Sequence, residues 1–121
     1  MASKWWSVVV DCADIRAQAR FWVLNYRVLY EADDEIVLAR DEHTWPGLIF
    51  VPVPEGKTVK NRLHIDLNPD DLEAEVRRLE ALGASRIDIG QGTVGWVVMA
   101  DPEGNEFCVL SPRPQADRRV P

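Results

Sequence analysis

A histidine and a glutamate in the second half of the chain have the side chains that could do chemistry together. His64 lies in Arg-Leu-His-Ile-Asp-Leu, and Glu106 lies in Asp-Pro-Glu-Gly-Asn-Glu-Phe. An imidazole and a carboxylate at one site can hold a divalent metal, which acts as a Lewis acid. Without a metal, the carboxylate could act as a general base that the imidazole orients. The pair is therefore the candidate catalytic or metal-binding centre.

Apolar residues occupy the matching positions of the first half. Val9 stands where His64 would be, and Ile49 stands where Glu106 would be. Val9 and Ile49 are 40 positions apart, and His64 and Glu106 are 42 positions apart. Neither valine nor isoleucine can bind a metal, so only half of a duplicated polar site is present. We expect Val9 and Ile49 to form an apolar wall that contacts the ligand.

Three further residues are candidates for substrate binding. Arg62 lies in a short basic run two positions before His64, and Trp96 is expected near the mouth of a cavity. Cys108 lies two positions after Glu106, which places both on one face of a strand. A catalytic cysteine needs a nearby base and an electropositive setting, and the sequence shows neither. We expect Cys108 and Cys12 to be buried free thiols, as in a reducing cytosol.

Length and composition indicate one soluble globular domain of 121 residues, with 46% hydrophobic and 28% charged residues. A net charge of −6 argues against nucleic-acid binding, which needs clustered Lys and Arg. No apolar run reaches the roughly 18 residues of a membrane-spanning helix, and the first residues lack the apolar stretch of a signal peptide. We expect a cytoplasmic protein without nucleic-acid or membrane partners.

Apolar periodicity, capping residues and turn residues predict the same order of elements in both halves. The first half has a helix at 15–24 and strands at 7–12, 26–31, 35–39 and 48–53. The second half has a helix that starts within Asn68-Pro69-Asp70-Asp71 and closes at Gly83, and strands at 63–67, 86–89, 95–100 and 106–110. The fold class is therefore α+β, a single domain of two βαβββ units at about 7–54 and 62–112, with a tail at 113–121.

Strand alternation predicts which side chains face the site. In the strand 63–67, the leucine and isoleucine side chains share one face and should meet the helix, so His64 should face away from it. The same rule places Glu106 and Cys108 on the inner face of the last strand, and Val9 on the inner face of the first. We expect each helix on the convex face of its sheet and one cavity shared by the two inner faces.

Three segments carry a family resemblance. They are Lys60–Leu67 (Lys-Asn-Arg-Leu-His-Ile-Asp-Leu), Asp101–Leu110 (Asp-Pro-Glu-Gly-Asn-Glu-Phe-Cys-Val-Leu) and Arg20-Phe21-Trp22. With them, the chain resembles the small glyoxalase-like members of the vicinal oxygen chelate superfamily, which includes glyoxalases, bleomycin-resistance proteins and extradiol dioxygenases. The resemblance covers about Ser7 to Pro112, nearly the whole chain.

The resemblance implies a metal site that this sequence keeps only in part. In that superfamily, a His or Gln and a Glu from each unit hold a divalent metal on the first and last strands. His64 and Glu106 match the second unit's pair, whereas Val9 and Ile49 replace the first unit's pair. A catalytic metal usually has at least three protein ligands. The resemblance also implies a homodimer, which the apolar pair Trp5-Trp6 supports, since aromatic residues are enriched at interfaces.

Two classes of function follow. We favour a small-molecule-binding glyoxalase-like protein with a half-retained metal or acid–base site and no assignable reaction, as bleomycin-resistance members sequester a ligand without chemistry. The alternative is a metal-dependent lyase, isomerase or dioxygenase that acts on a small substrate with vicinal oxygens. A third interpretation makes His64 and Glu106 a hydrogen-bonded structural pair. The cofactor stays unknown, with a divalent metal as one candidate, because fold analogy does not establish activity.

Overall fold

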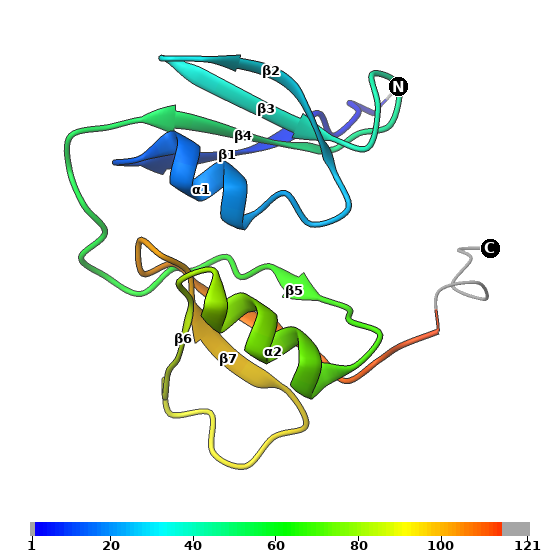
Figure 1. Ribbon diagram of the computed structural model, residues 1–121, viewed down its shortest axis with the longest axis vertical. Coiled ribbons are helices and arrows are strands. Elements are labelled where there is room, and N and C mark those ends of the chain that lie inside the picture. The colour runs from blue at the N-terminus through cyan, green and yellow to red at the C-terminus, as the bar shows by residue number, and fades with distance from the viewer. Residues whose placement is uncertain (1, 115–121) are drawn as a thin grey trace. The chain divides into compact units, whose positions relative to one another are not determined.

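The computed structural model describes residues 2–114 (Figure 1). Most of the predicted tail, 113–121, therefore lies outside the described residues. Within 2–114, no helix is long and apolar enough to cross a membrane. The chain divides into two compact units, Met1–Thr58 and Val59–Pro121, each of which is described by itself.

The first unit is a four-stranded sheet with one helix. Its elements are β1 (Ser7–Cys12), α1 (Ile15–Phe21), β2 (Arg27–Ala32), β3 (Glu35–Ala39) and β4 (Gly47–Pro52). The strand order is β1-β4-β3-β2, in which β1 runs parallel to β4 and the other neighbours are antiparallel. A parallel pair needs a crossover connection, which α1, β2 and β3 provide between β1 and β4.

The second unit repeats this arrangement. Its elements are β5 (Asp66–Leu67), α2 (Leu72–Ala81), β6 (Ser85–Arg86), β7 (Val97–Ala100) and β8 (Glu106–Val109). The strand order is β5-β8-β7-β6, with β5 parallel to β8 and the other neighbours antiparallel. The predicted α+β fold with two βαβββ units is therefore confirmed, because both sheets follow one topology.

Each helix lies beside its own sheet, as Figure 1 shows, and buries its apolar side there. In the first unit α1 packs on β3 and β4, and Phe21 and Phe50 are almost fully buried. In the second unit α2 packs on β8, where Val76 and Leu79 meet a core that includes Phe107. Removing such side chains from water is the main favourable contribution to folding. These cores keep the opposite sheet faces available for a site.

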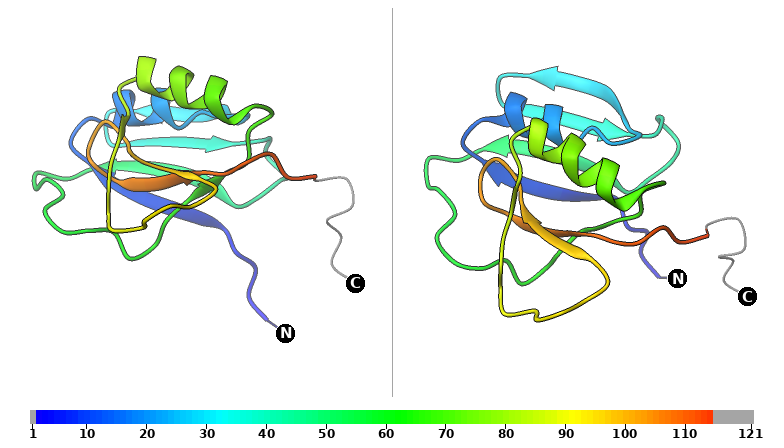
Figure 2. Two further views of the ribbon diagram at one scale, coloured as in Figure 1. Left: turned by 90° about the horizontal axis from the view of Figure 1, so that it is seen from below. Right: turned by 60° about the horizontal axis from the view of Figure 1, so that its bottom comes forward.

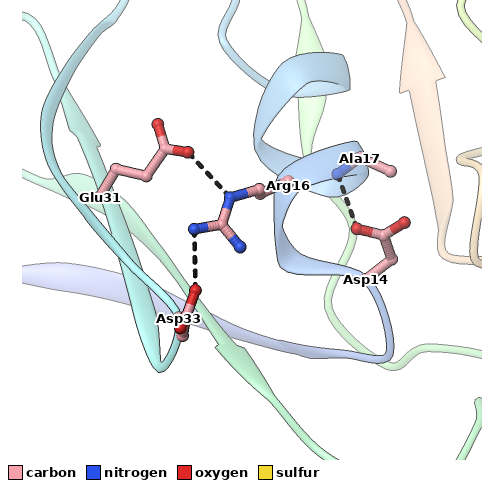
Figure 3. A network of polar contacts seen from close by, with 5 residues as sticks. All are labelled: Asp14, Arg16, Ala17, Glu31 and Asp33. Carbon is pink, nitrogen blue, oxygen red and sulfur yellow. Dashed lines mark hydrogen bonds and ion pairs between the residues drawn. The ribbon is translucent and has the colours of Figure 1, made fainter.

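A polar network ties the start of α1 to the turn between β2 and β3 (Figure 3). Asp14 caps the helix, since its carboxylate accepts the N–H of Ala17 at 3.0 Å. The Arg16 guanidinium donates to Glu31 at 3.0 Å and to Asp33 at 3.1 Å. Hydrogen bonds to Asp33 and then Glu31 raise the pKa of Arg16 above its ordinary value. The network is exposed, so it fixes local geometry more than it stabilises the fold.

The strand predicted at 63–67 is wrong for its first three residues. Only Asp66 and Leu67 pair with β8, and Leu63, which was expected to meet the helix, is 89% exposed. The physical reason is local. The His64 ring contacts the carbonyl of Asn61, and such side-chain to backbone hydrogen bonds compete with a strand ladder.

Other boundaries of the second unit also differ from the prediction, and β7 and β8 are each shorter than the strands predicted at 95–100 and 106–110. Asp71, not Asn68, caps α2, because the Asp71 carboxylate accepts the N–H of Ala74 at 2.9 Å. The strand predicted at 86–89 ends at Arg86. The segment that follows, 87–96, is a long loop (Figure 2). The N–H of Ile87 still donates to the carbonyl of Val98 at 3.1 Å, and beyond it side chains of the loop bond to its own backbone N–H groups.

Candidate functional site

An open pocket of about 800 Å³ lies within the second unit. Its lining combines an apolar surface with a small set of polar and charged groups. The lining residues are His64, Asp66, Asn68, Ile89, Gln91, Trp96, Val98, Cys108, Leu110 and Arg113. Three of the residues predicted for the site, His64, Trp96 and Cys108, are therefore among them.

Sheet register explains how the strands present these side chains. Cys108 on β8 pairs with Asp66 on β5 and with Val98 on β7, so these three residues form one row across the sheet. Paired residues of neighbouring strands point to the same face. Leu110 lies two positions beyond Cys108 and extends the same face. The pocket therefore lies on the sheet face that strand alternation predicted.

Glu106 is buried and accepts a hydrogen bond from the backbone of a distant segment. Only 8% of the residue is exposed, and its Oε1 accepts the N–H of Asn61 at 2.7 Å. A charge-assisted bond of this length is among the stronger hydrogen bonds in proteins. The carboxylate thus fixes the chain just before His64, which is a structural role that the sequence did not suggest.

His64 is exposed and contacts the carbonyl of Asn61, the residue whose N–H Glu106 accepts. Its Nε2 is 2.9 Å from the carbonyl oxygen of Asn61 and 3.3 Å from Nζ of Lys60. A carbonyl only accepts and an ammonium only donates, so Nε2 can hydrogen-bond to one of the two groups at a time; the shorter contact, to Asn61, requires the proton on Nε2. In the neutral ring, Nδ1 is then the acceptor. His64 and Glu106 are therefore linked through the backbone of Asn61.

The turn between β7 and β8 completes this arrangement. Asp101 is 4% exposed, and its Oδ1 accepts the N–H groups of Glu103 and Asn105, each at 2.9 Å. The turn is tight, since the N–H of Gly104 donates to the carbonyl of Asp101 at 2.9 Å. Asn105 then accepts from the Asn61 side chain at 3.1 Å. The Asp-Pro-Glu-Gly-Asn motif thus holds both Glu106 and its donor.

The cysteines are buried in separate units. Cys12 is 1% exposed at the end of β1, and its Sγ lies 3.7 Å from the carbonyl oxygen of Val10. Cys108 is 9% exposed and lines the pocket. Burial, followed by the negative charge of Asp66, raises the pKa of the Cys108 thiol, although Lys60 opposes the shift. A raised pKa keeps the sulfur protonated and weakly nucleophilic.

The family of this chain follows from a match of its sequence to a known domain family. Residues 7–110 match the glyoxalase-like domain family. The chain belongs to that family. A search of curated proteins gives no match.

Several solved structures share this glyoxalase-like fold. A glyoxalase/bleomycin resistance protein/dioxygenase family enzyme from Burkholderia phytofirmans PsJN is 19% identical, with a TM-score of 0.69 over 92% of this chain and 100% of its own. FosX, a fosfomycin resistance protein from Listeria monocytogenes, is 15% identical, with a TM-score of 0.70 over 93% and 94%. The trypanothione-dependent glyoxalase I of Leishmania major is 16% identical, with a TM-score of 0.62 over 91% and 87%. At these identities the likeness shows the fold alone.

The residues of this glyoxalase-like chain do not fit a resident metal. One FosX structure is a complex with Mn(II). Here, within either unit, the described residues contain no group of three His, Cys, Asp or Glu side chains that could hold an ion. Glu106 already accepts from the Asn61 N–H, and His64 Nε2 faces the Asn61 carbonyl. Two ligands would leave a metal weakly held.

The two residues predicted to form an apolar wall, Val9 and Ile49, lie in the first unit. Val9 and Ile49 are direct partners across the parallel pair β1 and β4, and Ile49 in turn pairs with Val37. Val9 is 56% exposed, on the opposite strand face from buried Cys12. That Val9 and Ile49 share a cavity with His64 stays a prediction. Arg62 is exposed and, like Glu106, is not among the pocket-lining residues.

Sequence reasoning missed Asn68, Gln91 and Arg113, all of which line the pocket. Asn68 begins the segment in which the second helix is predicted to start, and Gln91 lies between the strands predicted at 86–89 and 95–100. Arg113 was placed in the tail. A side chain from a loop or from the end of a domain has no periodicity to reveal which way it faces. Only the hydrogen bonds of the folded chain place these residues at the site.

Proposed function

We propose that this glyoxalase-like protein binds a small organic molecule in the pocket of its second unit. The observation that carries the proposal is the lining of that pocket, where Val98, Cys108 and Leu110 form an apolar surface beside a few polar groups. Ligand sites typically enclose about 300–1,000 Å³ and combine an apolar surface with a few orienting polar groups. The pocket volume of about 800 Å³ lies in that range.

Trp96 is the residue on which a planar part of the ligand would pack. It lines the pocket and is 39% exposed, so its ring is accessible. Tryptophan rings contribute a large contact area with little loss of side-chain entropy. The ligand we propose therefore has an apolar, preferably aromatic, body.

His64 would fix the orientation of that ligand. The ring is held by the Asn61 carbonyl, so Nδ1 is the acceptor for a ligand hydroxyl or N–H. Glu106 does not contact the ligand in this proposal. It positions His64 indirectly, because it accepts the N–H of Asn61. The half-retained polar pair thus serves ligand binding without a metal or a chemical step.

The experiment is a fluorescence titration with the neutral dye N-phenyl-1-naphthylamine. Trp96→Ala should weaken binding by at least about 5-fold, since a lost aromatic contact is worth about 1 kcal/mol and the lost buried area adds to it. Trp5→Ala is the matched control, because Trp5 is 66% exposed in the other unit and should leave the affinity unchanged. Equal affinities for the wild type and Trp96→Ala would exclude this pocket as the site.

A homodimer in a reducing compartment such as the cytoplasm completes the proposal. Trp5 and Trp6 are 66% and 60% exposed, and the Trp6 ring stacks on Trp45 at 4.1 Å between centroids. Exposed aromatic residues of this kind favour interfaces. Buried thiols at Cys12 and Cys108 suit a reducing compartment. Sedimentation equilibrium that gives the monomer mass at all concentrations would refute the dimer.

A further inference from the structure

We infer that Arg113 recognises an anionic group on the ligand and that Asn68 is the residue that positions it. The inference rests on the proposed function and adds the chemical class of the ligand, an aromatic or apolar body that carries a carboxylate, phosphonate or sulfonate. Neither residue belongs to the pair His64 and Glu106, which the glyoxalase-like resemblance marks as metal ligands.

Asn68 holds the chain at Arg113 through two reciprocal hydrogen bonds. The Asn68 Nδ2 donates to the carbonyl of Arg113 at 3.0 Å, and the N–H of Arg113 donates to the Asn68 Oδ1 at 2.8 Å. A side-chain amide carries the same donor and acceptor as a peptide group, so it can substitute for a strand partner. The N–H of Leu110 donates to the carbonyl of Leu67 just before this point. Asn68 therefore continues the pairing of β5 and β8 beyond the last ladder bond.

This anchoring gives the pocket its one arginine. Arg113 lines the pocket, whereas Arg16, Arg78 and Arg86 each pair with a carboxylate elsewhere. Within residues 2–114, Arg113 has no ion-pair partner. A guanidinium presents a planar fork of donors that matches the oxygens of a carboxylate or phosphonate. The pocket therefore offers a cationic group that no described carboxylate occupies.

Asp66 sets the direction in which such a ligand lies. It is the carboxylate among the lining residues, and it stands in register with Cys108 in the centre of the sheet face. An anion is repelled by Asp66 and attracted by Arg113, so the anionic group belongs at the Arg113 end. The apolar body then covers Cys108 and Val98.

Two dyes with the same ring system separate the charge from the rest of the ligand. 8-Anilinonaphthalene-1-sulfonate is anionic, and N-phenyl-1-naphthylamine is its neutral counterpart. Arg113→Gln should weaken binding of the sulfonate by about 10-fold or more, the loss expected for one charge-assisted hydrogen bond, and leave the neutral dye within about 2-fold. Arg113→Lys should recover part of the loss, because it restores the charge without the fork.

Three more variants complete the test. Asn68→Ala should lower the ratio of sulfonate to neutral-dye affinity while the circular dichroism of α2 stays unchanged, because Asp71 caps that helix. Asp66→Asn should raise the same ratio. Arg77→Gln, an exposed arginine on α2, is the charge-matched control and should change neither dye.

The outcomes separate the two proposals. If Trp96→Ala weakens both dyes while Arg113→Gln leaves their affinity ratio unchanged, the ligand site stands and Arg113 has no role in it. If Arg77→Gln lowers the ratio as much as Arg113→Gln does, only net charge matters, and the inference is again wrong. If Trp96→Ala affects neither dye, the proposed function itself fails.

Discussion

The carboxylate of Glu106 accepts the backbone N–H of Asn61 at 2.7 Å, across 45 positions of sequence. His64 contacts the carbonyl of the same residue at 2.9 Å. One peptide segment thus joins the two residues that a glyoxalase-like resemblance marks as metal ligands. His64 lines the pocket of the second unit, and Glu106, which does not line it, holds the segment that precedes His64.

Glu106→Ala should destabilise the protein, whereas Glu106→Gln should not. Alanine leaves the N–H of Asn61 without its acceptor at a buried site, a loss of about 1–3 kcal/mol in the free energy of unfolding. Glutamine keeps an oxygen at the position of Oε1. His64→Ala should change stability little, since the side chain is exposed. Urea unfolding of the three variants measures this, and equal stabilities for the alanine and glutamine variants at position 106 would show that the bond is unimportant.

Titration with Mn(II), Ni(II) or Zn(II) should show no stoichiometric site of the tightness typical of metalloenzymes. Among residues 2–114, His64 and Glu106 belong to no group of three potential ligands, and both are engaged with Asn61. Isothermal calorimetry on tag-free protein is the measurement. One equivalent bound with submicromolar affinity, and lost in His64→Ala, would restore the metal-enzyme alternative.

Asp71→Ala should cost about 1 kcal/mol of stability through loss of the α2 cap. The Asp71 carboxylate accepts the Ala74 N–H at 2.9 Å, whereas Asn68 bonds to Arg113 and not to the helix. Thermal unfolding of Asp71→Ala beside Asp71→Asn, which keeps a capping oxygen, measures the cap. A larger loss of helix dichroism in Asn68→Ala than in Asp71→Ala would show that Asp71 is not the cap.

Cys108 should react slowly with iodoacetamide near neutral pH, and faster only well into the alkaline range. Burial raises the pKa of its thiol, and the thiolate is the reactive form. Because the folded pKa lies above the unfolded one, any stability from this group is present at lower pH and is lost as the pH rises through the folded pKa. Mass spectrometry of the peptides that contain Cys108 measures the rate of alkylation. Cys12, at 1% exposure, should react more slowly still, and rapid alkylation of either cysteine in folded protein at neutral pH would contradict the burial.

Much of the fold could be predicted because the relevant signals are local. The hairpin strand Glu35–Ala39 has the predicted bounds, and Gly83 follows α2 with a φ of +109°, a conformation that glycine adopts readily. The topology followed from the repeat, since Val9 pairs with Ile49 in register. These features depend on residue types and spacing that the sequence shows directly.

The parts that could not be predicted depend on hydrogen bonds between distant segments. Nothing in the sequence marks the N–H of Asn61 as the partner of Glu106, because every residue except proline has such a group. Likewise, the sequence around Asn68 is typical of a helix start, and only the fold shows that its side chain bonds to the backbone of Arg113, 45 positions later. Leu63 was expected in the core from strand alternation, but the bend around Asn61 and His64 exposes it.

The central claim is that the pocket of the second unit is the ligand site. Backbone and indole ¹H–¹⁵N spectra recorded during a titration with N-phenyl-1-naphthylamine test it most directly. We expect saturable shifts at the Trp96 indole and at the amides of Asp66, Val98 and Cys108, with the Trp5 indole unmoved. Saturation with shifts confined to Trp5 and Trp6, or no saturable shift at Trp96, would contradict the account.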